Sequence, residues 1–420
     1  MTNGFDKYYQ SIKYLESILN LPIRNYLLKK NDRSFFIERL RYFLKLLGNP
    51  HRGFKFIHIA GTAGKGTTVN LIHEILNAAG CRVGSYFSPH PTTAIERIKV
   101  NDLYIGPDDF SKLIERLKPT LEICAQQSPY GHPSYFETFL ALAFLYFKKQ
   151  KCEYVILESG LGGLHDATNI IERPLVNIIT NINYDHQDIL GKSLTAIAKD
   201  KAGIIKKDSI FITTETRPPL LKIFHNQCRK KGAKFISLKT DNSDKNRILA
   251  EETALALNID DKYVQQGLAK AKLPCRFEAI QKKPLVILDG SHNPTKMAKV
   301  AENLKKLKYR RLILILGMAD DKDHQKTLEK IVPLADEVIL TRFLNPYRKS
   351  ADLKKLACIC KKLKAKKPIS CLDPWQALGY GQKIQKKDDL LLVTGSFFLT
   401  GELRTEWITE EYILKQQKSF

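Results

Sequence analysis

The chain has 420 residues and a formal net charge of +24, and hydrophobic side chains make up 43% of it. This length allows two or three domains with ordinary hydrophobic cores. The sequence contains no apolar run of about 18 residues, and the segment 1–19 is charged throughout, so it predicts neither a membrane span nor a signal peptide. We therefore expect a cytoplasmic protein.

The positive charge has two interpretations at this point. It can attract an anionic partner, such as nucleic acid, a membrane surface or a polyanionic small substrate, or it can be a lysine-rich surface without a specific role. The two basic runs, 305–311 and 361–367, lack the interleaved aromatic side chains of a base-stacking surface, so we expect no nucleic-acid partner. The eight cysteines form no C-x-x-C motif, which indicates free thiols.

Short β-rich runs alternate with longer helical patterns along the chain. The predicted strands are Phe56–Ala60, Val83–Phe87, Tyr154–Leu157, Val176–Thr180, Ile210–Thr213, Leu285–Leu288, Leu312–Leu316, Glu337–Thr341 and Leu390–Thr394. The predicted helices include Phe136–Phe147, Ser193–Ala198 and Pro294–Leu307. This alternation favours an α/β fold with largely parallel, buried sheets. A polar stretch at 281–284 precedes a fresh strand–helix series, which predicts a boundary between domains 1–280 and 281–420.

A glycine-rich segment follows the first predicted strand and opens a helical pattern. Its residues are Gly61, Thr62, Ala63, Gly64, Lys65, Gly66, Thr67 and Thr68. In such a segment, backbone N–H groups approach phosphate oxygens, the helix N-terminus adds partial positive charge, and Lys65 adds a full charge. The spacing departs from the usual Walker A motif, because two residues separate Gly61 from Gly64 and Gly66 follows Lys65. A glycine-rich turn without a ligand is therefore the alternative for this segment alone.

Polar residues also follow the later strands of the first domain. Glu158 ends one strand before a glycine-rich turn, where a carboxylate can hold Mg²⁺ on phosphate oxygens or simply end the strand. Asp185 and His186 follow the next strand, and a lone histidine more often packs or hydrogen-bonds than binds a ligand. Lys201 precedes a small turn, and an ordinary surface lysine is the default interpretation there.

Taken in order, these segments resemble the folylpolyglutamate synthase/dihydrofolate synthase group of the Mur ligase superfamily over nearly the whole chain. The motifs that carry the resemblance are Gly61–Thr68, Tyr86–His90 with Glu96–Ile98, Ser134–Glu137, Glu158–Gly163 with Asp166–Asn169, Asp185-His186 with Leu190-Gly191, Lys201–Ile204, Arg276–Glu278, Asp289–Pro294, Gly317–Asp323 and Thr394–Ser396. The resemblance implies a P-loop-type Mur ligase central domain with a mostly parallel sheet and a smaller, Rossmann-like C-terminal α/β domain. The first would bind ATP and folate over 1–280, and the second would be the glutamate ligase domain over 281–420.

The resemblance further implies an ATP-dependent acid–amino-acid ligase of folate biosynthesis and one-carbon metabolism. It would add L-glutamate to dihydropteroate, to reduced folates and their polyglutamates, or to both, through an acyl phosphate, releasing ADP and phosphate. The implied cofactors are two Mg²⁺ ions, with ATP as co-substrate, a carbamylated Lys201 and K⁺ as a further candidate. The implied partners are small molecules only, with no membrane, and the implied state is a monomer.

Residue roles carry over position by position. The implied ATP-binding residues are Gly61, Thr62, Gly64, Lys65, Gly66, Thr67, Thr68, Asn246, Arg276, Asp289 and His292. The implied metal ligands are Ser88, Glu158, His186 and Lys201, and the implied catalytic residues are Lys65, Glu158, His186 and Lys201. The implied substrate-binding residues are Ser134, Phe136, Asp166 and Ala167.

The chain departs from the family pattern in four places. Ala63 replaces the usual Asn, so one side-chain hydrogen bond of the loop is missing. Leu164-His165 stand where Arg-Leu is usual, and Ser291 replaces Ala. The region from Phe211 to Leu257 lacks extra strands and a His-Gln-x-x-Asn motif near the adenine, of which Asn246 matches only the last residue, so the adenine contacts stay open.

Two alternatives compete with the folate-type ligase. A sister Mur ligase acting on UDP-muramyl peptides is disfavoured by Gly66, which follows Lys65, and by the segment Asp289–Pro294. A basic nucleotide-binding module acting on nucleic acid is permitted by the charge, but no recognition motif supports it.

Overall fold

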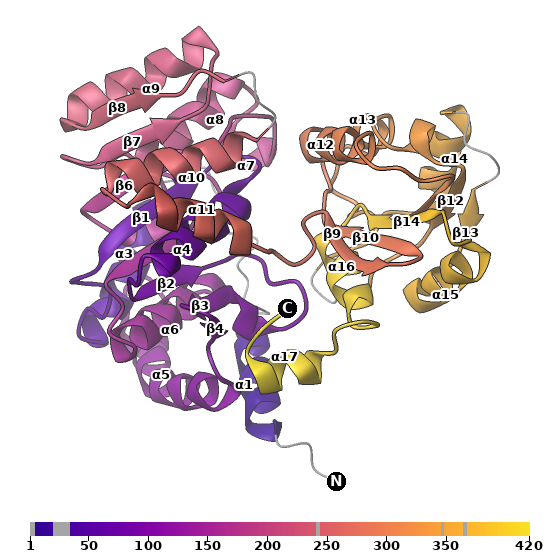
Figure 1. Cartoon of the computed structure of the whole chain (residues 1–420). Coiled ribbons are helices and arrows are strands. Elements are labelled where there is room, and N and C mark those ends of the chain that lie inside the picture. Colours follow the sequence, from indigo (N-terminus) through magenta and orange to yellow (C-terminus); the bar gives the residue numbers. More distant parts are fainter. Residues whose placement is uncertain (1–4, 20–33, 241–243, 346–347, 364–367) are drawn as a thin grey trace. The chain divides into compact units, whose positions relative to one another are not determined.

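The computed structural model describes residues 5–19, 34–240, 244–345, 348–363 and 368–420 (Figure 1). Parts of the basic run 361–367 and of the segment 242–246 therefore lie outside the described residues. The chain forms two compact units, one of Met1–Pro89, Ala94–Lys272 and Phe420, the other of His90–Thr93 and Leu273–Ser419. The predicted boundary at residue 280 falls inside strand β9 (Glu278–Lys282), which pairs with β10 (Leu285–Asp289) in the second unit.

The first unit is built on an eight-stranded sheet with the order β4-β3-β2-β5-β1-β6-β7-β8. Its strands are β1 (Lys55–Ala60), β2 (Val83–Tyr86), β3 (Ile98–Val100), β4 (Leu103–Tyr104), β5 (Tyr154–Glu158), β6 (Pro174–Ile179), β7 (Ile210–Thr213) and β8 (Lys234–Ser237). All neighbours are parallel except at the β4-β3-β2 edge, where the pairing is antiparallel. Strand β1 lies between β5 and β6, so the chain segments that follow these three strands share one edge of the sheet.

Helices of the first unit cover this sheet. They are α1 (Asp6–Leu19), α3 (Ser34–Leu46), α4 (Lys65–Ala78), α5 (Pro107–Gln127), α6 (Tyr135–Lys149), α7 (Gln187–Leu190), α8 (Leu194–Lys201), α9 (Pro218–Lys231), α10 (Lys245–Ala256) and α11 (Asp261–Lys270). Helix α4 contacts β1, β2 and β5, and α10 and α11 pack on α4 (Figure 1). Helix α6 is apolar on nearly all sides and is buried from Glu137 to Phe147, as expected for a helix inside the core.

The second unit holds a six-stranded sheet with the order β13-β12-β11-β14-β10-β9. Its other strands are β11 (Leu312–Leu316), β12 (Glu337–Leu340), β13 (Ile369–Ser370) and β14 (Leu390–Thr394), and its helices are α12 (Pro294–Leu304), α13 (His324–Leu328), α14 (Leu353–Lys362), α15 (Pro374–Ile384), α16 (Phe397–Arg404) and α17 (Glu410–Gln416). Only β9 is antiparallel to its neighbour.

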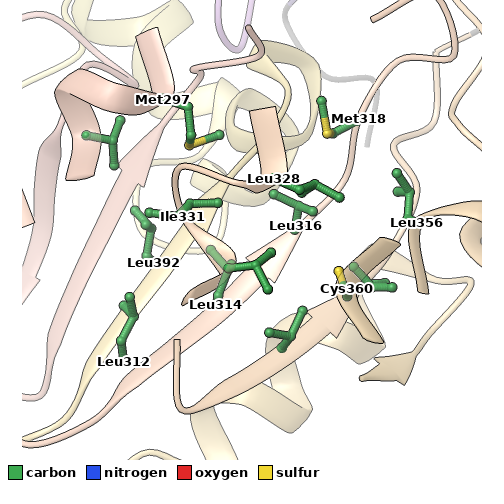
Figure 2. Packing of buried hydrophobic residues seen from close by; sticks show 14 of the residues in the cluster. Met297, Leu312, Leu314, Leu316, Met318, Leu328, Ile331, Leu356, Cys360 and Leu392 are labelled. Carbon is green, nitrogen blue, oxygen red and sulfur yellow. The ribbon is translucent and has the colours of Figure 1, made fainter. Parts of the chain in front are cut away.

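Alternation along β11 divides the core of this unit into two layers. Leu312, Leu314 and Leu316 project to one side, where they meet residues such as Met297 and Cys360 (Figure 2). The two intervening isoleucines of β11 join a second buried cluster on the other face. Because successive side chains of a strand point to opposite faces, this sheet is buried on both sides.

The predicted α/β class with mostly parallel sheets is confirmed, and three strands have the predicted bounds: Ile210–Thr213, Leu312–Leu316 and Leu390–Thr394. Strands β3, β4, β8, β9 and β13 were missing from the prediction. All of them lie at or next to a sheet edge, and β4, β8, β9 and β13 are partly exposed, so they lack the continuous apolar run of the central strands. None of the described helices is both long and apolar enough to cross a membrane.

Candidate active site

The glycine-rich segment runs from the end of β1 into helix α4, and two of its glycines are required by geometry. Gly61 has φ 147° and Gly64 has φ 84°, a region that favours glycine. A Cβ on Gly61 would lie 1.9 Å from Thr180 Oγ1, and a Cβ on Gly64 would lie 2.3 Å from Asn246 Oδ1. Gly64 is the N-cap of α4 and has no side chain to cap it, so the first backbone N–H groups of this helix can serve an anion.

Residues after β6 clamp this loop. The Ala63 N–H donates to Asn181 Oδ1 at 2.9 Å, and the Thr180 hydroxyl donates to the Ala63 carbonyl oxygen at 2.6 Å. The Asn183 N–H donates to Thr62 Oγ1 at 3.0 Å, and that hydroxyl donates back to the Asn183 carbonyl oxygen at 3.1 Å. The loop is therefore held through the backbone of Ala63, at the position where the family usually has an Asn side chain.

The sequence prediction assigned no role to Thr180 or Asn181. The signal that could have found them is their place directly after a buried strand next to β1 in a parallel sheet. Polar residues at the carboxyl end of such a strand lie beside the loop that follows its neighbour.

Two lysines meet at the same carbonyl group. Lys65 Nζ and Lys201 Nζ each donate to the Gly61 carbonyl oxygen, both at 3.1 Å. Lys201 ends helix α8 and is buried, so the default expectation of a surface lysine is wrong. Burial, together with the nearby charge of Lys65, lowers the pKa of Lys201 to about 7.

The Glu158 carboxylate lies against the first turn of α4. Glu158 is buried at the end of β5, and the Ser88 N–H donates to its Oε2 at 3.1 Å. A Cβ on Gly66 would lie 3.3 Å from the same oxygen, so the carboxylate needs the space that glycine leaves. The loop, Lys65, Glu158 and Ser88 thus come together at one edge of the sheet.

The remaining predicted residues at this edge make fewer direct contacts with the loop and with Glu158. His186 has a left-handed backbone conformation at the start of α7, and its Nε2 lies 3.7 Å from Asp185 Oδ1. Asp185 lies near enough to Lys201 to raise the pKa of that lysine against the effect of burial. Thr68 Oγ1 donates to the Gly64 carbonyl oxygen at 3.0 Å and lies 3.4 Å from Asn246 Oδ1, which brings Asn246 to the loop. Thr67 is half-buried in the first turn of α4.

The residues at this edge suit a magnesium ion. Among the described residues, no group of three or more His, Cys, Asp and Glu side chains is arranged to hold a metal ion. Mg²⁺ does not need such a group, because it uses one or two carboxylates and completes its shell with phosphate oxygens and water. Glu158 and the hydroxyl of Ser88 fit this requirement beside a phosphate-binding loop.

Two of the four predicted substrate-binding residues, Phe136 and Asp166, contact the turn after Glu158. A Cβ on Gly160 would lie 2.9 Å from the Phe136 ring and 3.3 Å from Asp166 Oδ2, so both side chains contact this turn. The Phe136 ring also packs edge-on against Tyr86, with centroids 5.7 Å apart. Burial raises the pKa of Asp166, while N–H donors from the neighbouring backbone oppose that shift. Ala167 follows at the start of a buried 3₁₀ turn, Ala167–Ile170.

Ser134 is fixed by a different network. It caps α6, where its side chain accepts from the Glu137 N–H while the Glu137 carboxylate accepts from the Ser134 N–H at 2.7 Å. Arg39 forms a buried ion pair with Glu137, with Nε 2.8 Å from Oε2. The start of α6, and with it Phe136, is therefore rigidly placed.

Three predicted residues lie in the second unit. Both oxygens of Asp289 accept backbone N–H groups, from Phe277 and from Ser291, each at 2.8 Å. The Arg276 guanidinium lies over the Phe397 ring, 4.4 Å from its centroid. His292 is influenced electrostatically by Arg276, which places the two near each other.

His292 has a defined protonation state. Its Nδ1–H donates to the Gly290 carbonyl oxygen at 2.9 Å, which leaves Nε2 to accept from Lys296 Nζ at 3.2 Å. Burial first, and then the positive charges of Lys296 and Lys322, hold the pKa of His292 well below its ordinary value. The ring is therefore neutral and lies among cationic side chains, an environment suited to an anion.

Comparisons with known proteins match both units of the chain to one family. The model of the Mur ligase middle domain matches residues 59–274, and that of the Mur ligase glutamate ligase domain matches residues 275–397. The dihydrofolate synthase/folylpolyglutamate synthase of Bacillus subtilis is 32% identical over 411 residues, covering 88% of this chain and 94% of that protein.

Solved structures share the fold. Escherichia coli FolC in complex with DHPP and ADP superposes with a TM-score of 0.77 and 27% identity, over 94% of this chain and 96% of that one. A Mycobacterium tuberculosis folylpolyglutamate synthase complexed with ADP has a TM-score of 0.87 over 97% of this chain and 99% of that one, and at 24% identity it supports the fold alone.

The phosphate-binding loop together with the matches to both Mur ligase domains defines an ATP-dependent ligase. The chain belongs to the Mur ligase family and, within it, to the folylpolyglutamate synthase/dihydrofolate synthase group.

Proposed function

We propose that this chain uses ATP to join L-glutamate to dihydropteroate, to reduced folates, or to both, releasing ADP and phosphate. The observation that carries this proposal is the convergence of the Gly61–Thr68 loop, Lys65, Glu158 and Lys201 at one edge of the first sheet. The names of the relatives support the substrate class, since they include dihydrofolate synthase and folylpolyglutamate synthase.

ATP would be held by its phosphates. Backbone N–H groups of the loop, the N-terminus of α4 and the Lys65 ammonium face the negative charge that spreads over a transferring phosphoryl group. Thr62, Thr67 and Thr68 would contribute as parts of this loop and of the first turn of α4, and Asn246 would lie at the nucleotide side of the loop. In the second unit, Arg276 and His292 would serve phosphate, and Asp289 the ribose.

Glu158 and Ser88 would hold one Mg²⁺, and His186, Glu158 and Lys201 would surround a second. A bound Mg²⁺ supplies positive charge to the phosphate oxygens. Potassium is a further candidate ion. Each of these assignments follows from the family resemblance together with the donor set on this sheet edge.

Lys201 would act as a carbamate. The neutral amine adds to CO₂ and loses a proton, which leaves a carbamate anion on Nζ. The lowered pKa, about 7, supports this step because a large share of the amine is unprotonated at neutral pH. An anion at this buried position suits a metal site, whereas an ammonium group would repel the metal ion.

The substrate carboxylate would attack the γ-phosphorus of ATP, and the resulting acyl phosphate would be attacked by the amine of glutamate. Phe136, Ser134, Asp166 and Ala167 would bind the pterin ring around the Gly160 turn. Leu164, which is exposed where the family usually has arginine, would change contacts with the pterin or its tail.

The test is direct. The purified protein is incubated with Mg-ATP and L-glutamate, with dihydropteroate and tetrahydrofolate in parallel, and products are read by mass. Gain of one glutamate on both substrates supports both activities, and gain on one assigns the chain to that step. Gain on neither overturns the proposal, and Lys65→Met serves as the inactive control.

The alternative substrate is tested in the same assay. A sister Mur ligase would turn over ATP with UDP-muramyl peptides, whereas we expect no turnover with them. A monomer and a cytoplasmic location also remain predictions, and light scattering after gel filtration tests the first.

A further inference from the structure

His58 is a buried histidine at the centre of the first sheet, and the reaction outlined above does not use it. It lies in β1, opposite Leu157 of β5 and Asn177 of β6, and is fully shielded from solvent. Its Nε2 lies 2.7 Å from Oγ1 of Thr168, a buried residue of the 3₁₀ turn Ala167–Ile170.

The direction of each hydrogen bond in this group is determined by chemistry. The Thr168 hydroxyl has one hydrogen and donates it to Asp166 Oδ1 at 2.5 Å, so the same oxygen must accept from His58 Nε2–H. Burial lowers the pKa of His58 to about 3, so the ring is neutral and its Nδ1 carries no proton. Among the described residues, no partner lies within hydrogen-bond distance of Nδ1. A buried acceptor nitrogen without a partner costs less free energy than a buried N–H without a partner.

Asp166 extends this chain of bonds to the glycine-rich turn. Its Oδ1 also accepts the Thr168 N–H at 3.0 Å, and its Oδ2 accepts the Leu161 N–H at 2.7 Å. A hydrogen-bonded path therefore runs from β1, directly below the phosphate-binding loop, to the turn that contacts Phe136.

We propose that His58 is a positioning residue that, through the Thr168 hydroxyl, sets the orientation of the Asp166 carboxylate and of the Gly160–Leu161 turn for an N–H-bearing pterin ring. This inference rests on the proposed function. A threonine hydroxyl can rotate about its C–O bond. The His58 N–H donates to the hydroxyl oxygen, which holds the hydroxyl hydrogen in the direction of Asp166. The carboxylate then presents a fixed acceptor to the ring.

The test compares four variants of the full-length chain: His58→Leu, Thr168→Val, the double variant and His58→Gln. Each of the first two should raise KM for the pterin substrate about tenfold, because one hydrogen bond to or beside a charged group is lost, while KM for ATP stays within about twofold. The double variant should be no worse than either single variant, because His58 acts only through Thr168. His58→Gln should restore KM, since its amide N–H can reach the position of Nε2.

His73→Leu is the matched control. His73 is equally buried in the same unit and has partners on both ring nitrogens, Ser85 Oγ and the Asn101 carbonyl oxygen, but none in this path. It should lower thermal stability without raising KM for the pterin. The inference is overturned if the effects of His58→Leu and Thr168→Val multiply, if KM for ATP rises equally, or if His73→Leu gives the same change.

A second readout separates this inference from the proposed function. If the wild-type protein ligates no glutamate, the proposed function fails, and the path is then read by ¹⁵N NMR of the His58 ring. A proton on Nε2 whose resonance shifts in Thr168→Val supports the path. A proton on Nδ1, or no shift, overturns it.

Discussion

The side-chain amines of Lys65 and Lys201 donate to the same oxygen, the carbonyl of Gly61, each at 3.1 Å. Two ammonium groups on one acceptor repel each other, and Lys201 is the more buried of the two. Burial and the nearby Lys65 therefore shift Lys201 toward its neutral form.

This relationship predicts a pH-dependent stability. The folded-state pKa of Lys201, about 7, lies below the ordinary value of 10.5. Below pH 7 the amine is protonated in both states, so the folded protein carries the full penalty of a buried charge. Between pH 7 and pH 10.5 only the unfolded state binds the proton, so the penalty is relieved as pH rises.

We therefore expect Lys201→Met to exceed the wild type in free energy of unfolding most strongly below pH 7, with the difference shrinking up to pH 10.5. Urea unfolding in bicarbonate-free buffer over this range measures it. Lys199→Met, which removes an exposed lysine of the same helix, is the matched control. A difference in unfolding free energy between Lys201→Met and the wild type that does not change with pH would show that the pKa of Lys201 is not lowered.

The clamp on Ala63 predicts that Asn181→Ala weakens ATP binding. The variant removes the acceptor of the Ala63 N–H, so the loop loses one of the bonds that order it before ATP arrives. One hydrogen bond of this kind corresponds to a roughly fivefold higher Kd for ATP, measured by calorimetry. Asn177→Ala is the control, because Asn177 lies in β6 and donates to Ser209 Oγ, away from the loop. Equal effects of the two variants on Kd would contradict the clamp.

Gly64→Ala should impair ATP binding much more than the backbone strain of an alanine in the left-handed conformation would by itself. The backbone strain amounts to about 1–2 kcal/mol, and the new Cβ would also lie 2.3 Å from Asn246 Oδ1. Gly80→Ala is the control, since Gly80 has φ 77° and no atom within 4 Å of an added Cβ, so it reports strain only. Thermal unfolding and Kd for ATP measure both variants.

Adding Asn246→Ala to Gly64→Ala tests the collision itself. The double variant should recover part of the lost thermal stability, because the amide that collides with the new Cβ is gone. No recovery would mean that the strain of the left-handed backbone, and not Asn246, accounts for the loss.

In the second unit, Glu278→Leu should be strongly destabilising. The carboxylate forms a buried ion pair with Arg404, with Nη2 2.9 Å from Oε1, and Arg404 is fully shielded from solvent. Removing one partner leaves an uncompensated buried charge, which costs about 3–5 kcal/mol of unfolding free energy.

The double variant Glu278→Leu, Arg404→Met should recover much of this loss, because no buried charge remains. Glu302→Leu, which breaks the exposed pair with Lys299, should change the unfolding free energy by about 1 kcal/mol or less. Denaturant unfolding compares the three variants, and equal losses for Glu278→Leu and Glu302→Leu would contradict the role of burial.

The local pattern of residues determined the central strands and the phosphate-binding loop. Runs such as Leu312–Leu316 are apolar at every position because both faces of their sheet are buried, and that composition is visible without a structure. Gly61, Gly64 and Lys65 were recognisable because a strand, a glycine loop and a helix are contiguous in the chain. The edge strands were not, since a partly exposed strand needs its neighbour to define it.

Only the tertiary structure decided which distant residues meet. Lys201 is 140 positions from Gly61, and its burial depends on α8 packing beside the loop, so its sequence context predicted an exposed lysine. Thr180 and Asn181 become a clamp because β6 pairs with β1, and His58 reaches Thr168 across 110 positions of the chain. Hydrogen bonds and pKa shifts depend on distances of a few ångströms between such segments, and strand order, which the sequence does not state, sets those distances.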